Sequence, residues 1–119
     1  MTSVLLAEDE FLIRAVLVDA LGELGMTCIE APTGQEALDV VTGTTPLAAI
    51  IVDIGLPDMS GEKVIEAAVR HRPGTPVIRC SGASGTAPAV GQKIHVVPKP
   101  YSATELSKFV ASLISQTAP

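Results

Sequence analysis

The feature of this sequence that most constrains its fold is a set of short apolar runs separated by longer segments with helical spacing. Four runs are clear, at Val4–Ala7, Ala48–Val52, Val77–Cys80 and Ile94–Val97, and a weaker one covers Thr27–Glu30. Apolar runs without alternating polar residues are typical of strands that are buried on both faces, as in a parallel sheet covered by helices. Strands that alternate with helices predict repeated βα units and an α/β fold.

Longer segments between and after these runs are predicted to form helices that begin near Glu10, Thr33, Ser60 and Ser102. Thr33 and Ser102 are each followed three residues later by a glutamate, which is the pattern of a helix capping box. Apolar residues of the first helix recur at helical steps and predict a stripe that faces the core. This stripe consists of Ile13, Leu17, Ala20 and Leu24.

Length and charge exclude several classes of protein. The 119 residues fit one compact domain, residues 1–119, with no room for a second. Eight lysines and arginines against thirteen acids give a net charge of -5 without a basic stretch, which argues against direct binding of nucleic acid. The longest apolar run, Leu47–Val52, is too short for membrane insertion. Cys28 and Cys80 lie far apart, which favours a reduced, cytoplasmic protein over a disulfide framework.

Polar residues follow four of the predicted strands at the point where each strand ends. Glu8 and Asp9 follow the first strand, Asp53 the third, Ser81 the fourth and Lys99 the fifth. In open parallel α/β sheets, functional groups gather in the crevice at the carboxyl ends of the strands. The sequence therefore predicts that acids, a hydroxyl group and a lysine converge on one edge of the sheet.

Four motifs occur in a fixed order: the acidic pair Glu8-Asp9, the segment Asp53–Gly61, Ser81, and the pair Lys99-Pro100. In this order and spacing the chain resembles, over nearly its whole length, the receiver domains of two-component response regulators of the chemotaxis-regulator type. The resemblance implies a flavodoxin-like, doubly wound α/β fold with five parallel strands in the order 2-1-3-4-5.

The resemblance also implies a function, in which Asp53 accepts a phosphoryl group from a phosphohistidine on a histidine kinase or a histidine phosphotransferase. A carboxylate can act as such a nucleophile and form an acyl phosphate. Lys99 would pair with one phosphoryl oxygen, and the Ser81 hydroxyl would donate to another after phosphorylation. Such a domain is not an enzyme in the ordinary sense, and it signals through contacts with an output protein that the sequence does not identify.

The same resemblance assigns a Mg²⁺ site to the chain. Its direct ligands would be Asp9, Asp53 and the backbone carbonyl of Gly55, and Glu8 would act mostly through water. Mg²⁺ suits oxygen ligands, and it removes the repulsion among carboxylates that are brought together away from water.

Two features depart from the family pattern. Many receivers carry an aromatic switch residue three positions before the lysine, and this chain has Val96 there. The span between Ser81 and Lys99 is a few residues shorter than in most receivers, and its three glycines and Pro88 predict that the fourth helix is short or irregular. The missing aromatic switch leaves open a pseudo-receiver, a scaffold of the same fold that works without phosphorylation, although the acid pair, Asp53, Ser81 and Lys99 argue against it.

Other interpretations of single residues are also open. Glu8 and Asp9 could simply form a solvated loop before a helix. Asp58 could have no role beyond shaping the turn after Pro57. A phosphatase with an aspartyl-phosphate intermediate ranks last, because Gly55 stands where such enzymes usually carry a second acid.

A second apolar stripe on the first helix consists of Phe11, Ala15 and Val18. Receivers that resemble this chain dock their kinase or phosphotransferase through that helix, so the stripe is a candidate docking face. The alternative is that it packs against a neighbouring helix.

Overall fold

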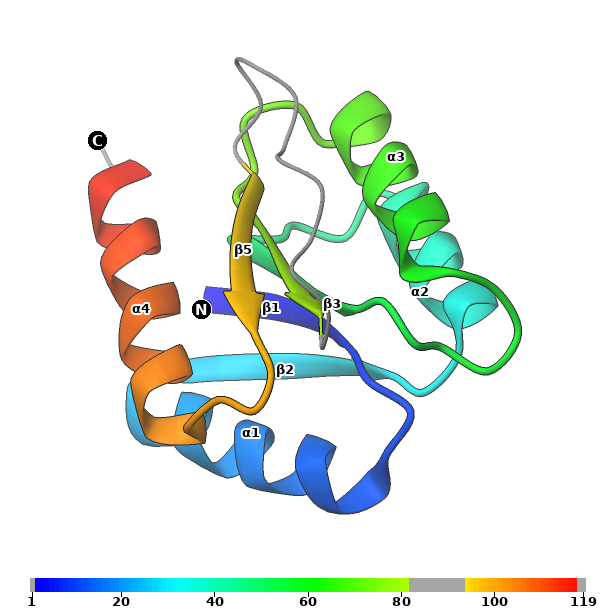
Figure 1. Ribbon diagram of the computed structural model, residues 1–119. Helices are drawn as coiled ribbons and strands as arrows, with labels where there is room; N and C mark the ends of the chain where they lie inside the picture. The colour runs from blue at the N-terminus through cyan, green and yellow to red at the C-terminus, as the bar shows by residue number, and fades with distance from the viewer. Residues whose placement is uncertain (1, 82–93, 118–119) are drawn as a thin grey trace.

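The computed structural model describes residues 2–81 and 94–117 (Figure 1). Along the chain its elements are β1 (Thr2–Ala7), α1 (Phe11–Glu23), β2 (Met26–Ala31), α2 (Gly34–Val41), β3 (Ala49–Asp53), α3 (Gly61–His71), β4 (Val77–Ser81), β5 (Ile94–Pro98) and α4 (Ala103–Thr117). The strands form one sheet in the order β2-β1-β3-β4-β5, and all neighbouring strands are parallel. The predicted flavodoxin-like α/β fold with strand order 2-1-3-4-5 is therefore confirmed.

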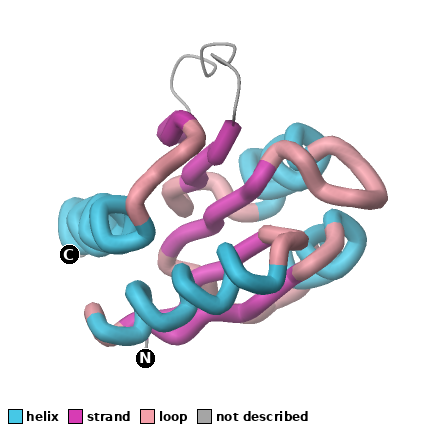
Figure 2. The backbone as a smooth tube through the Cα atoms, turned by 60° about the horizontal axis from the view of Figure 1, so that its bottom comes forward, coloured by secondary structure: helices cyan, strands magenta, loops and turns pink. Residues whose placement is uncertain are grey.

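Helices cover both faces of the sheet (Figure 2). α1 packs beside α4 on one face, and α2 packs beside α3 on the other. Val4 and Leu6 of β1 belong to the core under α1 and α4, whereas Leu5 and Ala7 belong to the core under α2 and α3. Successive side chains of a strand point to opposite faces, so a sheet that is covered on both sides needs an apolar residue at every position. This requirement explains the continuous apolar runs.

The helices begin where the sequence indicates. The hydroxyl oxygens of Thr33, Ser60 and Ser102 accept hydrogen bonds from backbone N–H groups in the first turns of α2, α3 and α4. The second half of the capping box differs at α2, because the Glu36 carboxylate accepts from the Thr33 hydroxyl group instead of from a backbone amide. α1 starts after Glu10, whose side chain makes no capping hydrogen bond.

The core-facing stripe of α1 differs in part from the prediction. Ile13 and Leu17 pack into the core as predicted, and Leu21 follows one turn later. Leu24 was predicted to face the core but is 45% exposed. The reason is that α1 has already ended, and Gly25, with a φ of 85°, turns the chain towards β2.

The predicted short or irregular fourth helix falls in residues 82–93, which lie outside the described residues. The described end of that span, Ile94–Pro98, forms β5 as predicted. Within residues 2–81 and 94–117, no helix combines the length and the apolar character that are needed to cross a bilayer.

Arg72, the residue after α3, ties the end of α2 and the following loop to α3. Its Nη2 donates to the carbonyl oxygens of Val40 and Gly43, both at 3.0 Å, and its Nε donates to that of Val41 at 2.9 Å. Its Nη1 donates to the carbonyl oxygen of Thr45. The last carbonyl groups of a helix lack partners within the helix and carry the negative end of its dipole. A single cationic side chain thus holds the end of α2 and the loop that leads to β3 in place.

We predict that Arg72→Met lowers the free energy of unfolding by about 2 kcal/mol, because several carbonyl groups lose a charged donor. Urea unfolding followed by circular dichroism measures this change. Arg70→Met is the matched control, since Arg70 is exposed on α3, and it should change the unfolding free energy by less than about 0.5 kcal/mol. Equal stability of the two variants would contradict the role given to Arg72.

The loop after β3 returns so close to the sheet that α3 begins on a glycine. The N–H of Gly61 donates to the carbonyl oxygen of Ile54 at 2.9 Å. A Cβ atom on Gly61 would lie 2.5 Å from the carbonyl oxygen of Asp53 and 2.8 Å from the Cα of Ile54, which is closer than real Cβ atoms come to their neighbours. Both neighbouring atoms belong to the backbone and cannot rotate away. The start of α3 is therefore packed directly against the last residue of β3.

We predict that Gly61→Ala lowers the free energy of unfolding by about 1–3 kcal/mol, because the added methyl group must push the backbone of β3 aside. Gly22→Ala is the control: Gly22 lies in α1 with nothing within 4 Å of its Cβ position, and alanine there should raise stability by about 0.5–1 kcal/mol. Urea unfolding compares the two variants. If Gly61→Ala is also stabilising, the close packing has no energetic consequence.

Candidate functional site

Three carboxylates from two neighbouring strands come together at the carboxyl edge of the sheet. Glu8 and Asp9 follow β1, and Asp53 is the last residue of β3, which pairs with β1. Each offers one carboxylate oxygen, and these oxygens all lie within 4.8 Å of one another. We call Glu8, Asp9 and Asp53 the acidic cluster. The structure thus brings together the three acids that the sequence analysis singled out.

Lys99, directly after β5, is a cation in contact with the acidic cluster. Its Nζ donates to Oδ1 of Asp53 at 2.8 Å, and the N–H of Gly55 donates to the same oxygen at 3.2 Å. Burial lowers the pKa of Lys99, but the hydrogen bond to Asp53 and the charge of Asp53 together raise it by more than burial lowers it. The pKa of Lys99 therefore lies above its usual value. Lys99 therefore stays charged at neutral pH.

Glu8 is the most deeply buried member of the acidic cluster, with 1% of its surface exposed. The pKa of Glu8 is raised to about 7 in total: burial raises it most, the hydrogen bond from the N–H of Glu10 lowers it, and the charge of Asp53 raises it. A carboxylate in such surroundings is costly to ionise without a neighbouring cation.

The ligand chemistry of the acidic cluster suits a hard divalent cation. Hard cations such as Mg²⁺ and Ca²⁺ prefer carboxylate oxygens, whereas softer metals prefer thiolates and imidazoles. Among residues 2–81 and 94–117, the group of potential metal ligands consists of carboxylates alone. A bound cation would also compensate the charge of the buried Glu8.

The two other predicted site residues lie at the same edge of the sheet. Ser81 ends β4, is 7% exposed, and accepts a hydrogen bond on its carbonyl oxygen from the N–H of Lys99 at 2.9 Å. Gly55 lies two residues after Asp53 and contacts it through its N–H. The roles of the Ser81 hydroxyl group and of the Gly55 carbonyl group stay predictions.

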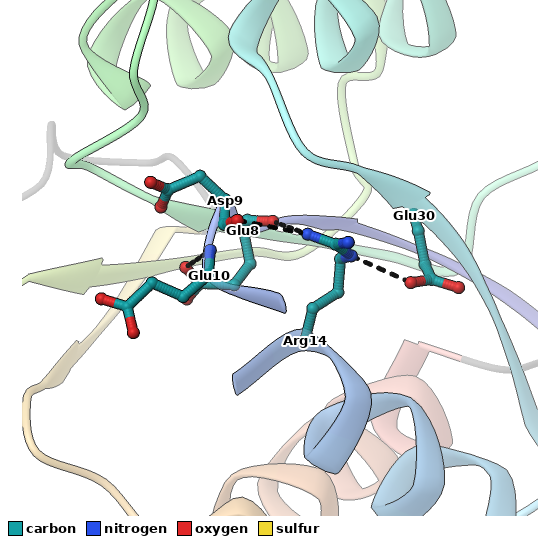
Figure 3. Close-up of polar contacts among 5 residues, drawn as sticks. All are labelled: Glu8, Asp9, Glu10, Arg14 and Glu30. Atoms are coloured by element: carbon teal, nitrogen blue, oxygen red, sulfur yellow. Dashed lines mark hydrogen bonds and ion pairs between the residues drawn. The ribbon is translucent and has the colours of Figure 1, made fainter. Parts of the chain in front are cut away.

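Sequence reasoning missed Arg14, which holds the loop between β1 and α1 in place (Figure 3). Its Nη1 donates to the backbone carbonyl oxygens of Glu8 at 2.9 Å and of Asp9 at 3.4 Å. Its Nε donates to Oε1 of Glu30, on β2, at 3.0 Å. The guanidinium carbon of Arg14 also lies 5.7 Å from the centre of the Phe11 ring. No local sequence pattern marks Arg14, because Glu30 lies 16 residues further along the chain.

Asp58 has a wider role than the turn after Pro57, so the interpretation that it only shapes this turn is wrong. Its Oδ1 accepts from the N–H of Gly34 at 2.7 Å, and its Oδ2 accepts from the N–H of Gln35 at 3.0 Å. These two hydrogen bonds hold the pKa of Asp58 below its usual value. A carboxylate is favourable at the start of a helix, so Asp58 fastens the loop after β3 to the start of α2.

An open groove of about 560 Å³ lies beside the acidic cluster, between α1 and the loop from β5 to α4. Leu12 and Val16 line it from α1, and Lys99 and Tyr101 line it from the loop. Tyr101 is half-buried, and burial raises its pKa. The signal that could have drawn attention to Tyr101 is its position two residues after Lys99. We call this hollow the α1 groove.

The exposed apolar side chains of α1 differ from the predicted second stripe. Phe11 is 68% exposed, and Ala15 is exposed as well. The prediction is wrong for Val18, which packs against the core below α1 and α4. Leu12 and Val16, at 74% and 56% exposure, continue the apolar surface of α1 instead.

The family model of the response regulator receiver domain matches residues 4–111. The chain is 31% identical over 114 residues to the DNA-binding transcriptional regulator NtrC of Klebsiella pneumoniae. The matched region covers 92% of this chain and 24% of NtrC. It is also 31% identical over 119 residues to the sensor kinase CckA of Brucella abortus (strain 2308). That matched region covers 96% of this chain and 13% of CckA. The chain thus spans a quarter or less of the length of these two relatives.

Solved structures of receiver domains share the fold. The receiver domain of the Francisella response regulator 1452 matches with a TM-score of 0.85 at 26% identity and covers 99% of this chain and 100% of its own. A CheY-like receiver domain protein from Methanospirillum hungatei JF-1 matches with a TM-score of 0.85 at 23% identity and covers 98% of this chain and 96% of its own. Since the family model covers most of the sequence and the fold is that of solved receiver domains, this chain belongs to the response regulator receiver domain family.

Proposed function

We propose that this chain is the phosphoacceptor domain of a two-component system and that Asp53 is the residue that becomes phosphorylated. The observation that carries the proposal is the placement of Asp53, which ends β3 at the carboxyl edge of the sheet with Lys99 at 2.8 Å and two further acids beside it. An oxygen of Asp53 would form a bond to phosphorus while the bond from phosphorus to the histidine nitrogen of the donor breaks.

Lys99 and Ser81 would assist this transfer from the ends of β5 and β4. Lys99 already touches Oδ1 of Asp53, so its ammonium group lies where the charge of the phosphoryl oxygens would accumulate. The Ser81 hydroxyl group would donate to another phosphoryl oxygen. The hydrogen bond from the N–H of Lys99 to the carbonyl oxygen of Ser81 keeps these two residues side by side.

Asp9, Asp53 and the carbonyl oxygen of Gly55 would hold Mg²⁺, with Glu8 acting mostly through water. The ion, when bound, neutralises charge on the carboxylates and on the phosphoryl oxygens. Burial of Glu8 and the mutual approach of the three carboxylates support this assignment, because both raise the cost of leaving the acidic cluster without a divalent cation.

The partner that delivers the phosphoryl group would be a histidine kinase or a histidine phosphotransferase that docks on α1. The α1 groove supports this assignment, since it presents exposed Leu12 and Val16 and reaches Lys99. Exposed apolar surface next to a reactive group is typical of an interaction site. We infer a cytoplasmic signalling role in which the output passes through contacts with a further protein.

Incubation with acetyl phosphate and Mg²⁺ is expected to add a single phosphoryl group to the chain, because a small phosphodonor needs the acidic cluster but no docking surface. Intact-mass spectrometry measures the adduct. Asp53→Asn removes the nucleophile and should abolish it, and an excess of chelator should do the same. An adduct that persists on the Asp53→Asn variant would refute the assignment of Asp53.

The pseudo-receiver alternative makes the opposite prediction for the wild-type chain. It requires that no adduct forms with acetyl phosphate, although the protein is folded and Mg²⁺ is present. The same result with the cognate histidine kinase would then favour a scaffold that works without phosphorylation.

Leu12→Glu is expected to slow phosphotransfer from a histidine kinase about tenfold, because a carboxylate in the α1 groove opposes apolar docking. The rate with acetyl phosphate should stay unchanged, since Leu12 is 74% exposed and lies outside the acidic cluster. Radiolabel transfer from the kinase and intact mass with acetyl phosphate give the two rates.

Leu24→Glu is the matched control, because Leu24 is also exposed but follows the opposite end of α1. It should leave both rates unchanged. Equal rates of kinase transfer for the Leu12 and Leu24 variants would show that the α1 groove does not take part in docking.

A further inference from the structure

We propose that Arg14 is a positioning residue for the acidic cluster and that Arg14, held by Glu30, sets the affinity of the cluster for Mg²⁺. The inference rests on the proposed function, since it concerns the same metal site. It assigns a role to two residues that do not belong to the acidic cluster and that come from α1 and β2 (Figure 3).

The contacts of Arg14 fix the backbone of Asp9 on both sides. The carbonyl group of Glu8 belongs to the peptide unit before the Cα of Asp9, and the carbonyl group of Asp9 belongs to the unit after it. Nη1 of Arg14 donates to both carbonyl oxygens, at 2.9 and 3.4 Å. Among the described residues, no donor binds the Asp9 carboxylate itself, so the direction of this side chain depends on its backbone.

Glu30 in turn fixes the orientation of the guanidinium group. Its carboxylate accepts from Nε of Arg14 at 3.0 Å, on a different edge of the planar group from the one that faces the loop. The side chain of Arg14 is 13% exposed, so little room is left for other orientations. β2 also contacts the loop directly, because the carbonyl oxygen of Ala31 accepts from the N–H of Glu8 at 3.1 Å. The loop that carries two of the three acids is thus fastened to the sheet twice.

A role of Arg14 through its charge and a role through its contacts with the loop predict opposite changes in the affinity for Mg²⁺ when Arg14 is removed. If the residue acted only through its charge, its removal would make the acidic cluster more negative and would tighten the binding of Mg²⁺. If it acts by holding the loop, its removal lets Asp9 leave its place and weakens the binding of Mg²⁺. Lysine at this position keeps the charge but has a single nitrogen that cannot hold the two carbonyl groups and Glu30 in one plane.

The test is the affinity for Mg²⁺, measured without any phosphodonor by titration of the ¹H–¹⁵N spectrum. Arg14→Met and Arg14→Lys are each expected to raise the Kd for Mg²⁺ about tenfold, in the range found when a residue that orients a metal ligand is lost. Glu30→Gln should raise it about threefold, and should have a much smaller effect when combined with Arg14→Met, because the two residues act as one unit. Arg70→Met, which removes an exposed arginine from α3, should leave the Kd unchanged.

Urea unfolding in the presence of a chelator separates folding from positioning, since a purely structural role of Arg14 would change stability without changing the Kd of the folded protein. If the Arg14 variants do not fold, Glu30→Gln is compared with Glu23→Gln, because Glu30 is half-exposed and its substitution keeps the core intact, and because Glu23→Gln removes the same charge from an exposed residue of α1. An unchanged or smaller Kd in the folded Arg14 variants, or, if those variants do not fold, a Kd for Glu30→Gln no larger than that for Glu23→Gln, overturns the inference alone. A wild-type chain that takes up no Mg²⁺ overturns the metal site of the proposed function and this inference with it.

Discussion

The ion pair between Lys99 and Asp53 is the interaction on which the rest of the site depends. Three carboxylates at the end of a buried sheet repel one another, and the pKa of about 7 for Glu8 reflects burial first and then the charge of Asp53. Lys99 follows β5 and Asp53 ends β3, with β4 between them. The pair can therefore form only when these strands are assembled in their final order. The electrostatics of the site thus depend on the topology of the sheet.

Arginines connect the elements around this frame. Arg14 joins α1 to the loop after β1 and to Glu30. Arg72 joins the end of α3 to the end of α2. Arg79, on β4, donates two hydrogen bonds to Glu62 on α3. Each guanidinium group presents several donors in a fixed plane and so binds more than one acceptor. A chain with few cations thus uses them to fix the loops and helices against the sheet.

The strands and the acidic cluster could be predicted because their signals are local. A run such as Val4–Ala7 is apolar at every position because both of its faces are covered, and Asp53 directly follows another such run. The contacts of Arg14 and Asp58 could not be predicted, because they join residues 16 and 24 positions apart and depend on the path of the loops. The exposure of Leu24 escaped prediction for a related reason, since apolar spacing does not reveal where a helix ends.

α1 links the two halves of the proposed function. Leu12 and Val16 are one turn apart and line the α1 groove together with Lys99, whose Nζ binds Asp53. Arg14 lies between them in the sequence, on the opposite side of the helix, and holds the loop that carries Glu8 and Asp9. Substitutions on the groove side of α1 therefore leave the contacts of Arg14 in place. Because the same helix carries both sets of residues, a partner that displaces α1 would also displace Arg14, and docking would then change the geometry of the acidic cluster.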